Sequence, residues 1–212
     1  MTTEYQRILP ELLKRELGVS NWAADRGKKT AHGITQRVAD RLGIDIDTID
    51  QQTAMDIYRV EFYEKPGFDQ FNDIRYQWRL TLDALHSGPR TIIRRLQNLI
   101  NLNRLKTSTE KIEVDGILGP QTNSAFNVMQ LEVFHEFQNR GFDYPMNRAI
   151  WDICSQLKAN QYSLYQQICM NDETQMVWWW GWTNRIRFEP DFYQPMRVHD
   201  ASEKALKYVR NS

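Results

Sequence analysis

Apolar residues recur at helical spacing near the start of the chain and predict a helix over residues 3–17, ended by Gly18. The apolar face of this helix holds Ile8, Leu9, Leu12 and Leu13. Pro10 either starts the helix at its first turn or kinks a helix that begins earlier.

Residues 18–34 have a different pattern, with few apolar positions among Gly, Asn, Ser, Asp and Lys. This composition predicts a long loop or a short hairpin near residue 25. Thr35 then provides an N-cap for a helix through Leu42, which Gly43 ends.

Helical periodicity dominates the rest of the chain. Thr53 followed by Asp56 resembles a capping box and predicts a helix that runs to Glu64. Six further helices are predicted, over 68–86, 89–104, 120–139, 145–158, 160–170 and 173–186. The pattern weakens after Pro190, where one last helix fits 201–210. The predicted fold class is therefore mostly α, with room for one small hairpin.

Composition agrees with a globular protein and narrows its partners. The 212 residues include 12% aromatics, enough for a substantial core, and suit one compact domain or a catalytic domain with a small appendage. Equal numbers of basic and acidic residues, 27 of each, leave no net charge to attract nucleic acid. Cys154 and Cys169 are expected to be two buried free thiols. No apolar leader or membrane span is found, so synthesis in the cytoplasm as a soluble protein is expected.

The first candidate site begins at Glu16, which continues the apolar stripe of the first helix. Desolvation on such a face disfavours the charged form of a carboxyl group and raises its pKa, as a general acid requires. Asp25 follows nine residues later in a polar loop that favours its ionised form. Two carboxyl groups with such different surroundings suit glycoside hydrolysis. By periodicity alone, however, a Glu at a helix end is more often a solvated or capping residue.

The complete spacing from Glu16 to Thr35, ELGVSNWAADRGKKTAHGIT, favours the catalytic interpretation. It resembles, without a gap, the signature of family 108 glycoside hydrolases, which runs E-G-G-Y and then D-x-G-G-x-T-x-x-G-I-T. These are phage endolysins and relatives with a lysozyme-like fold that hydrolyse the muramic-acid glycosidic bond of bacterial cell walls. Leu17 and Lys28 replace two glycines of the signature, so the loop is expected to differ in shape from its relatives.

The resemblance implies a role for each matching residue. Glu16 would donate a proton to the leaving oxygen, and Asp25 would stabilise the developing positive charge or activate water. Thr30 would help to position the water or the carboxylate. A polar third residue favours a single-displacement, inverting route over a retaining one.

The second candidate site is the segment VDGILGPQT at residues 114–122. It resembles the D-G-x-x-G-P-x-T element of the predicted peptidoglycan-binding subdomain that follows the catalytic part of these endolysins, and Gly181–Arg185 resembles their closing G-W-x-N-R motif. Asp115 and Thr122 are therefore candidate substrate-binding residues. Turn chemistry alone also explains the segment, with a rigid helix start at Pro120.

The chain contains further candidates for substrate and metal binding. Trp22 is a candidate for stacking on a sugar ring or for anchoring the loop to the core, and Thr35 is a further substrate-binding candidate. The tryptophans of residues 178–182 suit either sugar stacking or helix packing. The four histidines have no metal-ligand spacing, and neither a metal nor a cofactor is expected.

Together these features predict a lysozyme-like catalytic domain over 1–85, a helical peptidoglycan-binding subdomain over 86–190 and a tail over 191–212. The expected activity is hydrolysis of the β-1,4 bond between N-acetylmuramic acid and N-acetylglucosamine in peptidoglycan by a monomer. The alternatives are a lytic transglycosylase and a non-catalytic wall-binding or phage structural module. The enzyme is expected in the host cytoplasm and acts on the wall in the periplasm after delivery by a holin or a secretion system.

Overall fold

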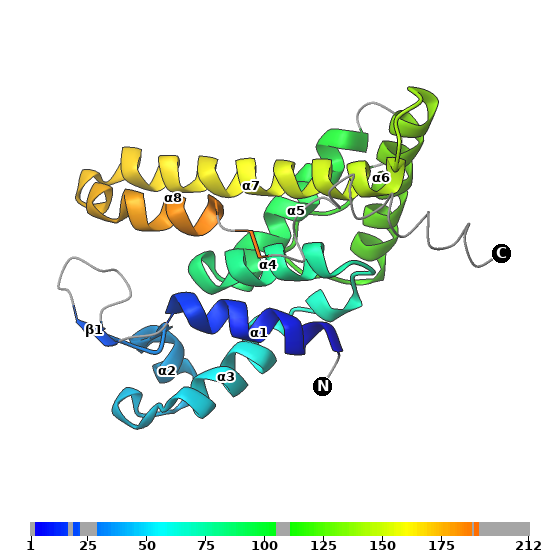
Figure 1. The fold of residues 1–212 in the computed structure, drawn as a ribbon. Coiled ribbons are helices and arrows are strands. Elements are labelled where there is room, and N and C mark those ends of the chain that lie inside the picture. Colours follow the sequence, from blue (N-terminus) through cyan, green and yellow to red (C-terminus); the bar gives the residue numbers. More distant parts are fainter. Residues whose placement is uncertain (1–2, 17–18, 22–28, 105–110, 188, 191–212) are drawn as a thin grey trace, which may run out of the picture.

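The computed structural model describes residues 3–16, 19–21, 29–104, 111–187 and 189–190, and these are mainly helical (Figure 1). The first part comprises α1 (Thr3–Glu16), β1 (Val19–Asn21), β2 (Lys29–Ala31), β3 (Ile34–Thr35), α2 (Gln36–Leu42), η1 (Ile46–Thr48), α3 (Gln51–Arg59), η2 (Val60–Glu64) and η3 (Phe68–Gln70). The second part comprises α4 (Ile74–Ser87), α5 (Pro89–Arg104), α6 (Pro120–Asn139), α7 (Pro145–Asn171), η4 (Glu173–Trp178) and α8 (Trp179–Arg187). The strands form one antiparallel sheet in the order β1-β2-β3. The predicted mostly-α fold with a small hairpin is confirmed.

Capping explains where the helices of the first part begin and end. The Thr35 hydroxyl accepts the Val38 N–H at 3.4 Å, and α2 ends at Gly43 in the left-handed conformation, as predicted. The capping box predicted at Thr53 is wrong. Asp50 caps α3 instead, because its carboxylate accepts the Thr53 N–H at 2.7 Å and the helix starts at Gln51.

The helix α1 begins at Thr3, as predicted, so Pro10 lies in its interior and does not start the helix. Another expected boundary changes. The two helices predicted over 145–158 and 160–170 are one helix, α7, because its buried stripe continues through the expected break with Leu157, Gln161 and Tyr165 at four-residue spacing. The helix predicted over 201–210 lies outside the described residues.

The centre of the molecule is α4, which lies between α1 and α7 and also packs against α5 (Figure 1). All residues from Arg75 to Ala84 are buried, so the polar groups among them need partners inside the protein. The Tyr63 hydroxyl donates to the Gln77 side-chain oxygen at 2.6 Å.

Buried side chains before and after residue 85 belong to one core cluster. The division of the chain into two domains at this residue stays a prediction.

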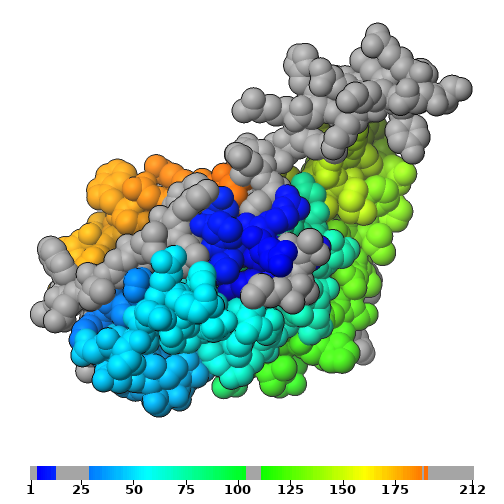
Figure 2. All heavy atoms as spheres, turned by 60° about the horizontal axis from the view of Figure 1, so that its bottom comes forward, coloured from blue at the N-terminus to red at the C-terminus, as the bar shows by residue number. Residues whose placement is uncertain are grey.

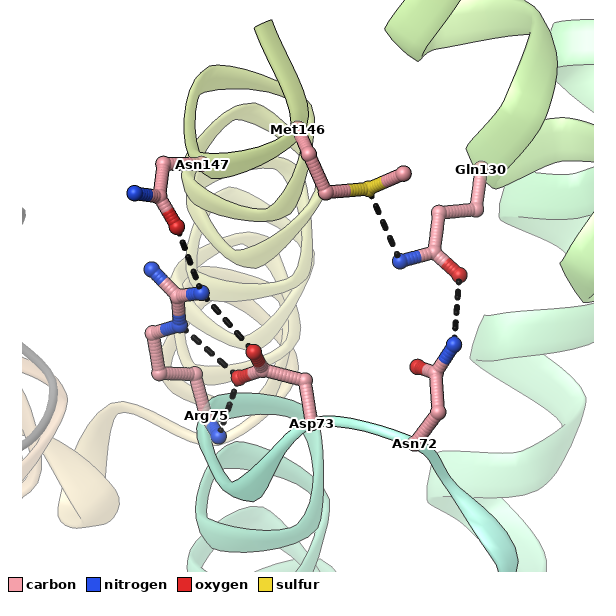
Figure 3. Close-up of polar contacts among 6 residues, drawn as sticks. All are labelled: Asn72, Asp73, Arg75, Gln130, Met146 and Asn147. Atoms are coloured by element: carbon pink, nitrogen blue, oxygen red, sulfur yellow. Dashed lines mark hydrogen bonds and ion pairs between the residues drawn. The ribbon is translucent and has the colours of Figure 1, made fainter. Parts of the chain in front are cut away.

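Polar side chains fasten the start of α4 to α6 and α7 (Figure 3). Asp73 caps α4 by accepting the Arg75 N–H at 2.9 Å, and it also binds the Arg75 guanidinium through two hydrogen bonds of 2.8 Å. The same guanidinium donates to the Asn147 side-chain oxygen on α7 at 3.2 Å. Asn72 donates to Gln130 on α6 at 3.4 Å. These contacts fix the direction in which the chain enters its central helix.

The cysteines agree with the prediction of free buried thiols. Cys154 and Cys169 are both buried, neither forms a disulfide, and both lie on α7. Fifteen residues along one helix separate them by about 22 Å, far beyond disulfide reach. None of the helices in the described part of the chain has the length and apolar character needed to cross a bilayer.

Candidate active site

Glu16 is the last residue of α1, three residues before the start of β1, the first strand of the sheet. The buried face of α1 carries Tyr5, Ile8 and Leu12, each at most 1% exposed. Glu16 follows Leu12 by four positions along the same helix. Its side chain lies outside the described residues, as do Trp22 and Asp25 entirely.

Thr30 lies on the central strand of the sheet, beside the strand that follows Glu16. It pairs with Ser20 on β1 and with Thr35 on β3. Ala31 and Ile34, a second cross-strand pair, are 4% and 1% exposed and turn their face of the sheet toward the core. Because successive residues of a strand point to opposite faces, half-buried Thr30 and Thr35 lie on the face away from the core. The fold therefore brings Thr30 next to the segment that leaves Glu16.

The tight turn between β2 and β3 is supported from α3. His32 and Gly33 have φ values of 48° and 79°, the positive values that a two-residue hairpin turn requires. The Tyr58 hydroxyl donates to the His32 carbonyl oxygen, and Lys29 of β2 forms an ion pair with Asp47. Tyr58 was missed in the sequence because no spacing relates it to a turn 26 residues earlier.

The second candidate site, at residues 114–122, is organised around Gln97 of α5. The Gln97 amide donates to the Asp115 carboxylate at 2.8 Å and to the Thr122 hydroxyl at 3.1 Å, while its oxygen accepts the Gly116 N–H at 2.9 Å. Hydrogen bonds from Gln97 and from the Ile117 N–H hold the pKa of the Asp115 carboxyl below its ordinary value. Thr122 is only 4% exposed. The side chains of Asp115 and Thr122 therefore stabilise the turn and the first residues of α6.

Gly116 is the position at which this turn tolerates least change. Its φ is 80°, and a Cβ there would lie 2.6 Å from the Arg90 Cγ and 3.0 Å from the Arg90 carbonyl oxygen. We expect Gly116→Ala to lower the free energy of unfolding by roughly 2–4 kcal/mol, from backbone strain and overpacking together. Urea denaturation followed by circular dichroism measures this loss in the free energy of unfolding.

Gly43 offers a matched control, because its φ is 67° but nothing lies within 4 Å of the Cβ position. Gly43→Ala therefore reports backbone strain alone, about 1 kcal/mol. Equal losses in the two variants would show that the contact with Arg90 contributes nothing.

Among the tryptophans of residues 178–182, two pack against α7 and one is mostly exposed. Trp182 stacks on Tyr165 of α7 with ring centroids 4.9 Å apart, and Trp179 meets Tyr162 edge-on at 5.1 Å. Trp180 is 68% exposed. Two of these side chains therefore fasten α8 to α7, as the packing interpretation expects.

Within the described ranges, no three His, Cys, Asp or Glu side chains gather where they would hold a metal ion. The polar groups of the two candidate sites are carboxylates, hydroxyls and amides. Such groups are suited to acid–base chemistry and to hydrogen bonding with a polar ligand.

Comparison with known proteins gives a family match over the first part of the chain. Residues 9–85 match the family model described as glycosyl hydrolase 108, and this segment includes Glu16, Asp25 and Thr30. The fold is similar to the solved structure of SagA from Brucella abortus, with 20% sequence identity and a TM-score of 0.61. The likeness covers 88% of this chain and 91% of that one. No curated protein sequence matches this chain.

Proposed function

Because residues 9–85 match the glycosyl hydrolase 108 family model, we propose that this protein is a glycoside hydrolase, specifically an N-acetylmuramidase acting on bacterial peptidoglycan. It would cleave the β-1,4 bond between N-acetylmuramic acid and N-acetylglucosamine. The observation that carries this proposal is the gap-free run from Glu16 to Thr35, together with the pairing that places Thr30 beside the strand after Glu16.

The roles follow from the chemistry of each group. Glu16 donates a proton to the glycosidic oxygen as the bond to the leaving sugar breaks. Asp25, as a carboxylate, stabilises the positive charge on the sugar ring or takes a proton from the attacking water. The Thr30 hydroxyl holds that water from the rigid central strand. Attack by water in a single displacement would invert the anomeric configuration.

Analysis of the products tests the reaction. Digestion of purified peptidoglycan should release new reducing ends that mass spectrometry identifies as intact N-acetylmuramic acid. Anhydro-muramic ends would identify a lytic transglycosylase, and wall binding without new ends would identify a non-catalytic module. Either result would overturn the proposed hydrolysis.

As its biological role, we propose that of a monomeric phage endolysin that a holin releases to the wall. A secreted antibacterial toxin that uses the same reaction is the second candidate. Expression in a bacterial host should cause lysis when a holin is produced with the protein and not without it. Lysis that requires export through a secretion system would favour the toxin.

A further inference from the structure

The far end of the α7–α8 hairpin contains a pocket that the candidate active site does not use. Its volume is about 710 Å³, within the range of small-molecule sites. Residues from the last turns of α7, from η4 and from the start of α8 form its walls. The lining residues are Gln166, Cys169, Met170, Glu173, Met176 and Trp179.

Helical geometry explains why these side chains meet. Gln166, Cys169 and Met170 are three and four residues apart on α7 and so share one face. The 3-10 helix η4 has three residues per turn, which aligns Glu173 and Met176 along one edge. Trp179 continues that three-residue spacing into α8.

The walls are held in place by contacts behind them. The Asp172 carboxylate caps η4 by accepting the Thr174 N–H at 3.1 Å and the Thr174 hydroxyl at 2.6 Å. Gln175, between the lining residues of η4, is 3% exposed. Tyr162 supports the Trp179 ring edge-on. These contacts hold η4 and the Trp179 ring in place beside α7.

The lining combines one aromatic plane and soft apolar groups with a few polar ones. An indole offers a flat apolar surface, Gln166 can both donate and accept hydrogen bonds, and the Glu173 carboxylate accepts them. Glu173 carries the only charge among the six lining residues, and it is negative. The matching ligand has a flat apolar face, hydroxyl or amide donors at its edge, and no negative charge.

We propose that this pocket is a second, non-catalytic glycan site that binds an N-acetylglucosamine ring. The apolar face of the pyranose would lie on Trp179, its hydroxyl and amide groups would reach Gln166 and Glu173, and the acetyl methyl would contact Met176. The free carboxylate of a muramic acid residue without a stem peptide would be repelled by Glu173, so the neutral sugar is preferred over it.

The pocket is placed to act on the same polymer as the candidate active site, an extension that rests on the proposed function. The end of α7 that carries it and the β-sheet beyond α1 lie at the same end of the molecule (Figures 1 and 2). A glycan strand held in the pocket would stay close to the sheet region and raise the local concentration of bonds to be cleaved.

A spectroscopic titration tests the site directly. The protein carrying Glu16→Gln is titrated with N,N′-diacetylchitobiose while the indole N–H resonances are followed by NMR. The Trp179 resonance, assigned from its loss in Trp179→Phe, should shift on titration, and the Trp180 resonance should not. Shifts confined to other tryptophans would overturn the proposal.

Calorimetry with chitotetraose gives the affinities of variants. Trp179→Ala should weaken binding about tenfold or more, the loss expected when an aromatic anchor is truncated. Trp180 is the adjacent tryptophan and is exposed, and Trp180→Ala should leave the affinity for chitotetraose unchanged. Glu173 is exposed, so Glu173→Gln should not affect folding. This variant should instead reduce the difference in affinity between chitotetraose and muramic-acid-containing oligomers.

The failures of the two proposals are distinguishable. Glu16→Gln should retain the pocket's affinity for chitotetraose whether or not it abolishes hydrolysis. Loss of binding in Glu16→Gln but not in Trp179→Ala would place the sugar in the catalytic region and reject the second site. Binding of a neutral detergent in the pocket with no response to either oligosaccharide would identify an apolar docking surface instead.

Discussion

Replacing Glu16 with glutamine should lower the rate of peptidoglycan hydrolysis by about 10²–10⁴-fold, the contribution of a general acid. Glutamine keeps the size of the side chain and its hydrogen-bonding oxygen but has no proton to give to the leaving sugar. The rate is measured as clearance of a suspension of purified peptidoglycan, with reducing ends counted in parallel. Circular dichroism should show the wild-type helical content.

The same substitution at Glu11 provides the matched control. Glu11 is one of the other glutamates of α1, half-buried and five residues before Glu16. Glu11→Gln should clear the suspension at close to the wild-type rate. Full activity in Glu16→Gln, or an equal loss in both variants, would contradict the role given to Glu16.

The sequence predicted elements whose cause lies within a few neighbouring residues. Thr35, Gly43 and Pro120 mark helix ends through their own hydroxyl or backbone geometry, and all three mark helix boundaries in the structure. The spacing of Thr53 and Asp56 predicts a capping box at Thr53, whereas Asp50 is the residue that caps α3. A cap at Asp50 binds the Thr53 N–H, whereas a cap at Thr53 would bind an N–H two or three residues further on, and periodicity alone does not choose between these two helix starts.

Contacts between distant segments could not be predicted in this way. The support of the β2–β3 turn by Tyr58 and the arrangement of Asp115, Gly116 and Thr122 around Gln97 depend on tertiary packing. The motif around Asp115 was visible in the sequence, but the glutamine that organises it was not identifiable as its partner. At the first site the sequence supplied the residues and their spacing, whereas only the fold shows that Thr30 pairs beside the strand after Glu16.

The largest loss of stability is expected from Asp83→Asn, which breaks the ion pair at the centre of α4. Arg79 and Asp83 are 1% and 3% exposed. The Arg79 Nε donates to the carboxylate at 3.0 Å, a second guanidinium nitrogen also binds it, and a third donates to the Ile186 carbonyl oxygen of α8 at 3.2 Å. Burial raises the pKa of the Asp83 carboxyl, while Arg79 acts in the opposite direction. Removing the carboxylate leaves a buried guanidinium uncompensated, at a cost of about 3–5 kcal/mol in the free energy of unfolding.

An exposed ion pair with the same four-residue spacing is the control that distinguishes the effect of burial from the effect of charge. Glu136 and Arg140 lie four residues apart on and just after α6, 3.5 Å from each other and more than half exposed. Glu136→Gln should cost less than about 1 kcal/mol in the same urea denaturation, since water screens the pair. The double variant Arg79→Met/Asp83→Leu should lose less than Asp83→Asn, because it removes both buried charges and keeps the apolar volume. If Asp83→Asn were no worse than Glu136→Gln, the buried pair would not stabilise the packing of α4 against α8.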